Sequence, residues 1–103
     1  MSAYVIFEVQ IHDAEKWKDF SQRLRPLLAA AGATYLVRGG VPKVHEGDWS
    51  PQRLSILEFP SKQALEDFYE GSAYQRLIAM RQEFSSARFV SVDGLPYDPA
   101  RSE

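Results

Sequence analysis

Arg38 is the first residue in this sequence to which we assign a chemical role, because two glycines, Gly39 and Gly40, follow it directly. Residues 33–38 are predicted to form a strand, so Arg38 would stand at a strand end where no neighbouring side chain crowds the backbone. A guanidinium in that place presents two parallel N–H donors to a carboxylate. We therefore predict that Arg38 anchors an anionic ligand, and an ion pair with Glu8 or Glu58 is the structural alternative.

The candidate catalytic residues are two carboxylates, Glu8 and Glu58, on strands that we expect to be neighbours. If both lost contact with water, one of them would have a raised pKa and would serve as a general acid or base. The alternative interpretation is structural, with each carboxylate paired to Arg38 or Arg81. Either arrangement predicts that the two glutamates share a face of the sheet.

Three aromatic residues and one further arginine complete the candidate ligand-binding set. Trp49, Tyr69 and Tyr74 are expected to wall a pocket, where the tyrosine hydroxyls would hydrogen-bond a ligand. Aromatic residues at helical spacing are also typical of a hydrophobic core. Arg81 follows Leu77 by one helical turn, and by spacing alone it is a surface arginine.

Several other kinds of chemistry lack their residues. The sequence has no cysteine, which excludes disulfides, thiolate nucleophiles and Cys-ligated zinc. Its two histidines, His12 and His45, form no i, i+4 pair and no HExxH motif, so we interpret both as solvated. Nucleotide-binding loops, the nucleophilic-serine motif and calcium loops are also missing. We therefore expect no metal site and no cofactor.

Length and charge set further limits. The 103 residues are 45% hydrophobic, enough for one core, and 12 basic and 14 acidic side chains give a net charge of -2. That balance argues against nucleic-acid binding, which depends on phosphate contacts. No apolar stretch is long enough to cross a membrane and residues 1–20 do not resemble a signal peptide, so we expect a cytoplasmic protein. The expected organisation is one domain over 1–94 and a C-terminal arm over 95–103.

Hydrophobic periodicity predicts an alternation of strands and helices. Asp13 is placed to cap a helix that Gly32 would end, Pro26 is expected to kink that helix, and Gly71 is expected to interrupt the second helical region. The predicted strands are 3–11, 33–38, 53–59 and 87–93, and the predicted helical regions are 13–31 and 61–81. This order favours an α+β, ferredoxin-like βαββαβ sandwich, in which both helices cover one face of a four-stranded antiparallel sheet.

The other face of that sheet, here called the open face, has an apolar character. Alternation along the strands places there Tyr4, Ile6, Glu8, Gln10, Leu36, Arg38, Leu54, Ile56 and Glu58. So many apolar groups exposed to water would promote association. We therefore predict a homodimer whose two sheets pack face to face around a barrel-like interior.

The residues already described also carry a family resemblance. The run Leu-Val-Arg-Gly-Gly at 36–40, then Glu-Gly-Asp-Trp at 46–49 and Leu-Glu-Phe-Pro-Ser at 57–61, together with Tyr69 and residues 74–81, resembles a small bacterial family. That family is the domain of unknown function number thirteen-thirty, within the dimeric α+β barrel superfamily, and the resemblance covers Ala3 to about Gly94. It implies a ferredoxin-like protomer and a homodimer, and it raises Arg81 above an ordinary surface residue. The wider superfamily includes cofactor-independent monooxygenases, isomerases, haem-degrading enzymes and ligand-sensing domains, so it implies no single activity.

Two functional hypotheses follow. In the first, a homodimer binds a small organic carboxylate or carbonyl compound in a cleft between the sheet and the second helix. Arg38 would hold the anion, Glu58 or Glu8 would move a proton, and the chemistry would be cofactor-free isomerisation or oxygenation. In the second hypothesis, the protein is a non-catalytic ligand-sensing or interaction module whose charged residues are structural. An open cavity that contains Arg38 or Glu58 would favour the first hypothesis.

Overall fold

The computed structural model describes residues 1–95 and contains four strands and three helices in that range. Their order and bounds are β1 (Ala3–Ile11), α1 (Ala14–Ala30), β2 (Thr34–Gly40), β3 (Leu54–Phe59), α2 (Lys62–Glu70), α3 (Ser72–Arg81) and β4 (Ser85–Asp93). The predicted C-terminal arm lies outside the described residues except for Leu95. Among the described helices, none combines the length and the apolar character needed to cross a membrane.

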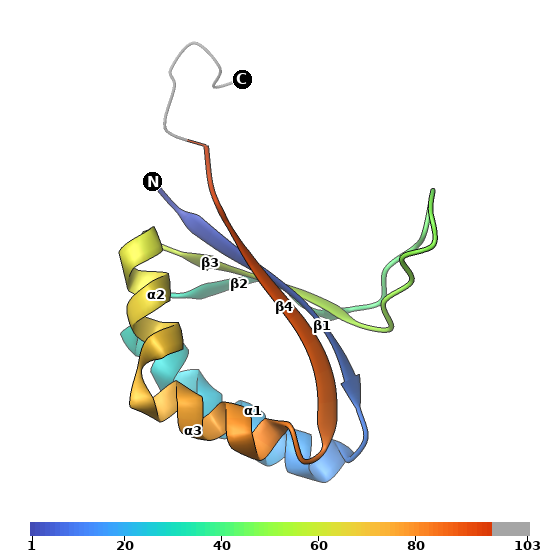
Figure 1. The fold of residues 1–103 in the computed structure, drawn as a ribbon, viewed down its shortest axis with the longest axis horizontal. Helices are drawn as coiled ribbons and strands as arrows, with labels where there is room; N and C mark the ends of the chain where they lie inside the picture. Colours follow the sequence, from blue (N-terminus) through green and yellow to red (C-terminus); the bar gives the residue numbers. More distant parts are fainter. Residues whose placement is uncertain (96–103) are drawn as a thin grey trace.

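The four strands form one antiparallel sheet in the order β2-β3-β1-β4. The three helices lie together on one side of this sheet, and α1 and α3 run next to each other (Figure 1). This arrangement confirms the predicted ferredoxin-like α+β fold. The only difference in element count is that Gly71 divides the second helical region into α2 and α3, as its position in the sequence predicted.

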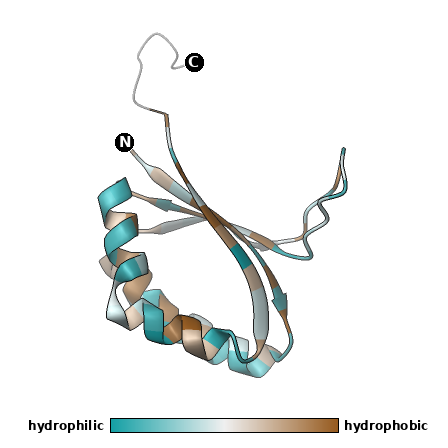
Figure 2. Cartoon of the chain, viewed as in Figure 1, coloured by the Kyte–Doolittle hydropathy of each residue, from teal (hydrophilic) through white to brown (hydrophobic). Residues whose placement is uncertain are grey.

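The hydrophobic core fills the space between the sheet and the helices. On β1 the odd-numbered residues are buried, and the even-numbered ones from Tyr4 to Glu8 are only partly covered, so the strand has one core face and one open face. The helices contribute stripes at three- and four-residue spacing, such as Phe20, Leu24 and Leu28 on α1. Figure 2 shows hydrophobic residues along the strands and in the middle of α3.

Local sequence explains where the helices begin and break. The Asp13 side chain accepts hydrogen bonds from the backbone N–H groups of Glu15 and Lys16, and Ser61 caps α2 in the same way. Gly71 lies between α2 and α3 in an extended conformation. A Cβ atom at Gly71 would lie 3.0 Å from the backbone oxygen of Asp67, so any other residue would require the end of α2 to shift slightly.

Strand β2 contains two register shifts that the sequence did not predict, one between Tyr35 and Val37 and one between Val37 and Gly40, and the first is a β-bulge that decides the position of Arg38. Tyr35 pairs with Leu57 and Val37 pairs with Ile56, so one extra residue, Leu36, stands between two consecutive pairs. The extra residue changes the alternation, because Tyr35 and Leu57 face the helices whereas Val37 and Ile56 lie on the open face. The prediction that Arg38 lies on the open face is therefore wrong, since Arg38 follows Val37 and lies on the helix side.

Residues 41–53, between β2 and β3, form no helix or strand. In Figure 1 this segment projects from the end of the sheet, away from the helices. It agrees with the long excursion that the turn residues of the sequence predicted. The segment carries Trp49 back toward the open face, where the indole N–H reaches Glu8.

Candidate functional site

A cleft of about 410 Å³ lies between α1 and the ends of β1, β2 and β3. We call it the helix-side cleft, and it is lined by Phe7, Val9, Ile11, Trp17, Lys18, Ser21, Tyr35, Arg38, Gly39, Arg53 and Ser55. The cleft predicted beside the second helix corresponds to a smaller groove of about 230 Å³ between α2 and β4, which contains Tyr69 but not Arg38. Arg38 lines the helix-side cleft because of the bulge in β2.

Two arginines are held at the sheet wall of the helix-side cleft. The Arg38 guanidinium lies over the Tyr35 ring, with its central carbon 5.1 Å from the ring centroid. Arg53 donates a hydrogen bond from Nη1 to the backbone oxygen of Gly39 at 3.3 Å. The backbone N–H of Gly39 donates in turn to the Ser55 hydroxyl at 2.8 Å. These contacts keep both cationic groups beside the same short stretch of β2.

Gly39 lies within β2 and its backbone favours a residue without a side chain. Its φ angle is +62°, in the left-handed region that favours glycine. The strand predicted over 33–38 therefore continues through both glycines to Gly40. The role of Gly39 in the site is to let β2 place its carbonyl and amide groups against Arg53 and Ser55.

Tyr35 is the one tyrosine among the residues that line the helix-side cleft. Burial raises the pKa of its hydroxyl, and the positive charges of Arg38 and Arg25 oppose that shift. The hydroxyl is consequently protonated near neutral pH. In that state the hydroxyl is a hydrogen-bond donor and not a base.

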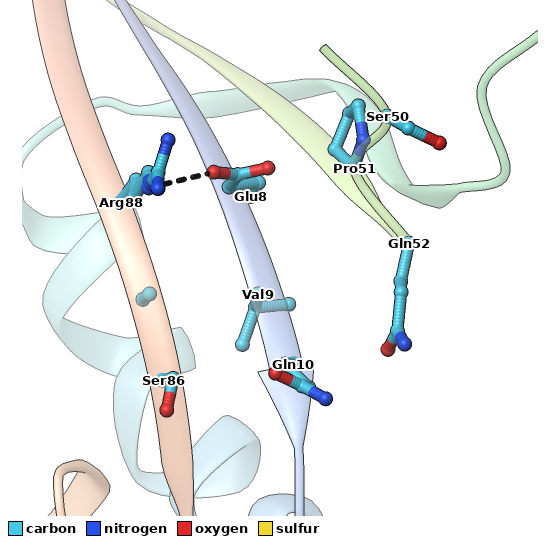
Figure 3. A pocket seen from close by; sticks show the side chains of 9 residues that line it. Glu8, Val9, Gln10, Ser50, Pro51, Gln52, Ser86 and Arg88 are labelled. Atoms are coloured by element: carbon cyan, nitrogen blue, oxygen red, sulfur yellow. Dashed lines mark ion pairs between the residues drawn. The ribbon is translucent and has the colours of Figure 1, made fainter. Parts of the chain in front are cut away.

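Glu8 lies on the open face and has partners that the sequence did not predict. Its Oε1 is 3.2 Å from Nε of Arg88 on β4, and its Oε2 accepts a hydrogen bond from the Trp49 indole at 3.2 Å. Figure 3 shows Glu8 and Arg88 pointing toward each other across the neighbouring strands, with Ser50 and Pro51 opposite them. The expected pairing of Glu8 with Arg38 or Arg81 is wrong, because both arginines are on the other side of the sheet.

Glu58 also lies on the open face, but far from Glu8. Its Oε2 accepts a hydrogen bond at 3.1 Å from the hydroxyl of Tyr4, its cross-strand neighbour, and this bond raises the pKa of Tyr4. Glu8 is four residues from Tyr4 along β1, which separates the two glutamates by about 13 Å. The shared face is confirmed, but the two carboxylates cannot act as a coupled pair. Neither of them reaches a ligand held by Arg38.

The remaining predicted residues are distributed over other parts of the protein. Tyr74 is only 4% exposed and packs in the core against Phe68, and Tyr69 lines a separate groove beside β4. Trp49 lies over the open face. The structure therefore brings only Arg38 of the predicted set into the helix-side cleft.

Arg81 is 9% exposed and has a buried Nε atom without a hydrogen-bond partner among residues 1–95. Burial raises the pKa of Tyr74 to about 12, and the positive charge of Arg81 acts against that rise. Tyr74 and Arg81 are two helical turns apart on α3, so they occupy the same buried stripe. The expectation of a surface arginine from spacing alone is wrong, since Arg81 belongs to the interior.

Sequence analysis missed several residues that line the helix-side cleft. Arg53 belongs to the alternation of Ser55, Leu57 and Phe59, so the period of β3 already placed it on the helix side. Lys18 is adjacent to Trp17 on α1, and both residues line the cleft. No signal of comparable clarity marks Tyr35, because its position depends on the bulge.

A comparison with protein-family models matches residues 2–95 to the family described as "Domain of unknown function (DUF1330)". The chain belongs to this family. The match includes every strand and helix of the structure, and it confirms the resemblance found in the sequence. A search of curated proteins finds no match to this DUF1330 protein.

Solved structures with the same fold include proteins of known and unknown function. A protein of unknown function from Rhodopseudomonas palustris has a TM-score of 0.72 and 16% identity, over 93% of this chain and 84% of that chain. SnoaB, a cofactor-independent oxygenase from Streptomyces nogalater, has a TM-score of 0.63 and 12% identity, over 95% and 97%. A dimeric ferredoxin-like protein of unknown function from Thermobifida fusca has a TM-score of 0.59 and 11% identity, over 90% and 91%. At these identities the likeness concerns the fold.

Proposed function

We propose that this DUF1330 protein binds a small organic acid in the helix-side cleft, with Arg38 as the anchor for its carboxylate. The observation that carries the proposal is the position of Arg38, held over Tyr35 at the wall of a cleft large enough for a small molecule. A guanidinium forms charge-assisted hydrogen bonds with a carboxylate, and the Tyr35 hydroxyl adds a neutral donor. Phe7 and Trp17 supply apolar surface for the rest of the ligand.

The composition of the helix-side cleft favours binding over proton transfer. Its eleven lining residues include no carboxylate and no histidine. Glu8 and Glu58 lie on the opposite face of the sheet, so they are removed from the proposal as proton carriers for this ligand. Burial keeps Tyr35 protonated, and a protonated tyrosine stabilises a negative charge instead of creating one.

Cofactor-free oxygenation is the second candidate function. The likeness in fold to SnoaB, described as a cofactor-independent oxygenase, supports it. In such a reaction Arg38 and Tyr35 would stabilise negative charge that develops on a bound substrate. Isomerisation is less well supported than it was from sequence, because it needs a base beside the ligand and the two glutamates lie elsewhere.

We further propose that two copies of the chain pack through their open faces. Val90 and Val92 are 60% and 53% exposed there, and Val37 extends the same apolar surface on the other edge of the sheet. The comparison with ferredoxin-like proteins described as dimeric supports a second copy as the occupant. In this arrangement Glu8, Glu58 and Trp49 serve the dimer, and the ligand lies on the other side of each sheet.

Arg81 does not line the helix-side cleft, so the proposal does not include it among the contacts of the ligand. Its buried guanidinium belongs to the interior stripe of α3, together with Tyr74.

Replacement of Arg38 tests the binding proposal, with benzoate as the probe. We expect Arg38→Met to raise the benzoate Kd about tenfold, since removal of one charge-assisted pair costs roughly 1.4 kcal/mol or more. Arg76→Met, an exposed position on α3, is the matched control and should leave the Kd unchanged. Binding is followed by NMR titration, which also shows that each variant is folded. Equal benzoate affinity in the wild type and Arg38→Met would contradict the proposal, as would no benzoate binding to the wild type.

A further inference from the structure

The helix-side cleft has more cationic side chains than one carboxylate needs as partners. Lys18, Arg38 and Arg53 all line it, and none of its other lining residues is acidic. The two ion pairs among residues 1–95 join Arg23 to Asp19 and Arg88 to Glu8, so neither includes these three cations. We infer that the ligand carries two negative charges, and that Lys18 and Arg53 bind the second one. This inference rests on the proposed function.

The three cations reach the cleft from two walls. Arg38 and Arg53 belong to the sheet wall, where Arg53 is fixed by its bond to the Gly39 oxygen. Lys18 belongs to α1 and lies on the helix wall. A ligand held by both walls needs anionic groups that reach both, which one carboxylate paired with Arg38 does not provide.

Electrostatics favours a dianion for the same reason. Three like charges around one cleft repel one another. A ligand with one negative charge leaves a net charge of about two on the filled site, whereas a dianion leaves about one. The cleft therefore discriminates by total charge, and the field of three cations also raises the local concentration of multivalent anions.

The surface between the two cationic walls is apolar, which defines the rest of the ligand. Phe7, Val9, Ile11 and the ring of Trp17 line this part of the helix-side cleft. Flat, apolar groups pack well against such side chains. The expected class is an aromatic compound with two negative charges, provided by two carboxylates or by one phosphate ester.

The test compares three probes that share one aromatic ring: benzoate, isophthalate and phenyl phosphate. We expect isophthalate or phenyl phosphate to bind the wild-type protein at least tenfold more tightly than benzoate in NMR titrations. If only isophthalate binds at least tenfold more tightly than benzoate, the two negative charges come from two carboxylates. If only phenyl phosphate does so, they come from one phosphate ester. Either result supports a dianionic ligand, and equal affinity for all three probes would overturn it.

Variants separate this inference from the proposed function. The double variant Lys18→Met/Arg53→Met should lose most of the preference for dianions, measured as the ratio of the benzoate Kd to the isophthalate or phenyl phosphate Kd. Because Arg53→Met also removes the bond to Gly39, the single variant Lys18→Met is measured as well and should lose part of the preference. The control is Lys62→Met/Arg76→Met, two exposed cations on α2 and α3.

Failure of the dianion inference and failure of the proposed function give different results. A dianion preference that survives in both Lys18→Met and the double variant would overturn the role of Lys18 and Arg53. Benzoate binding that persists in this case leaves the proposed function intact. If no probe binds the wild type, the proposed function itself fails.

Discussion

Tyr74 shows how burial changes the chemistry of a single residue. Its pKa is raised from 10 to about 12 by burial, so in the folded protein the hydroxyl stays protonated at pH values where an unfolded chain has lost that proton. The resulting contribution to the free energy of unfolding is present below pH 10. It is lost as the pH rises through about 12, because the unfolded state releases its proton first.

The expected alkaline loss is on the order of 2–3 kcal/mol, from a shift of about two pKa units. We expect the free energy of unfolding of Tyr74→Phe to lack this alkaline decrease, since phenylalanine keeps the packing and cannot ionise. The measurement is urea unfolding of both proteins at about pH 9 and about pH 12. An equal loss of stability in the two proteins would show that Tyr74 does not titrate with a raised pKa.

At the residue scale, the types of the candidate residues were easier to predict than their partners. Arg38 follows from the sequence as an arginine beside two glycines, and in the structure it lies at the wall of a cleft. Glu8 was paired with the wrong arginines, because a strand pattern gives the face of a residue but not its neighbour across the sheet. The register with β4, which places Arg88 opposite Glu8, becomes known only when the strands are paired.

At the element scale, the bulge in β2 determines the site. Regular alternation from Tyr35 would place Arg38 on the open face, whereas the extra residue Leu36 returns it to the helix side. The caps at Asp13 and Ser61 and the break at Gly71 were predictable, since each has a residue type with a strong local preference. A bulge at Leu36 has no such marker, because leucine is an ordinary strand residue.

Deletion of Leu36 tests this role of the bulge. Removal of the extra residue eliminates the first of the two register shifts in β2 and leaves Arg38 on the helix side, so we expect benzoate affinity within threefold of the wild type. The free energy of unfolding should fall by about 1 kcal/mol or less, because Leu36 is 52% exposed. NMR titration and urea unfolding provide both quantities.

The matched control is deletion of Val90 in β4, the other edge strand, whose pairing with β1 is regular. There the deletion moves every following residue of the strand to the opposite face, so the loss of stability should be several kcal/mol. If deletion of Leu36 weakens benzoate binding as much as Arg38→Met does, the bulge does not have the proposed role.

At the scale of the whole molecule, the sheet separates the two proposed functions. Its helix side contains the cleft with Arg38, and its open face carries the apolar residues and the Glu8–Arg88 pair. The order of strands and helices was sufficient to predict this fold, because only a few connections between such elements are compact. It was not sufficient to assign each candidate residue to one side of the sheet, so residues from both sides were combined into one predicted site.

The open face gives the last prediction, that Val90→Asp abolishes the dimer. Val90 is 60% exposed and is the cross-strand partner of Ile6. In the Val90→Asp variant, face-to-face packing of two sheets would bury one new carboxylate from each protomer in apolar surroundings. We expect the dimer Kd to rise at least 100-fold, as measured by analytical ultracentrifugation.

Ala79→Asp adds the same charge on the exposed surface of α3 and should leave the dimer Kd unchanged. Benzoate affinity should persist in the Val90→Asp monomer, since the cleft lies on the other side of the sheet. A Val90→Asp protein that still dimerises as the wild type does would show that the open face is not the interface.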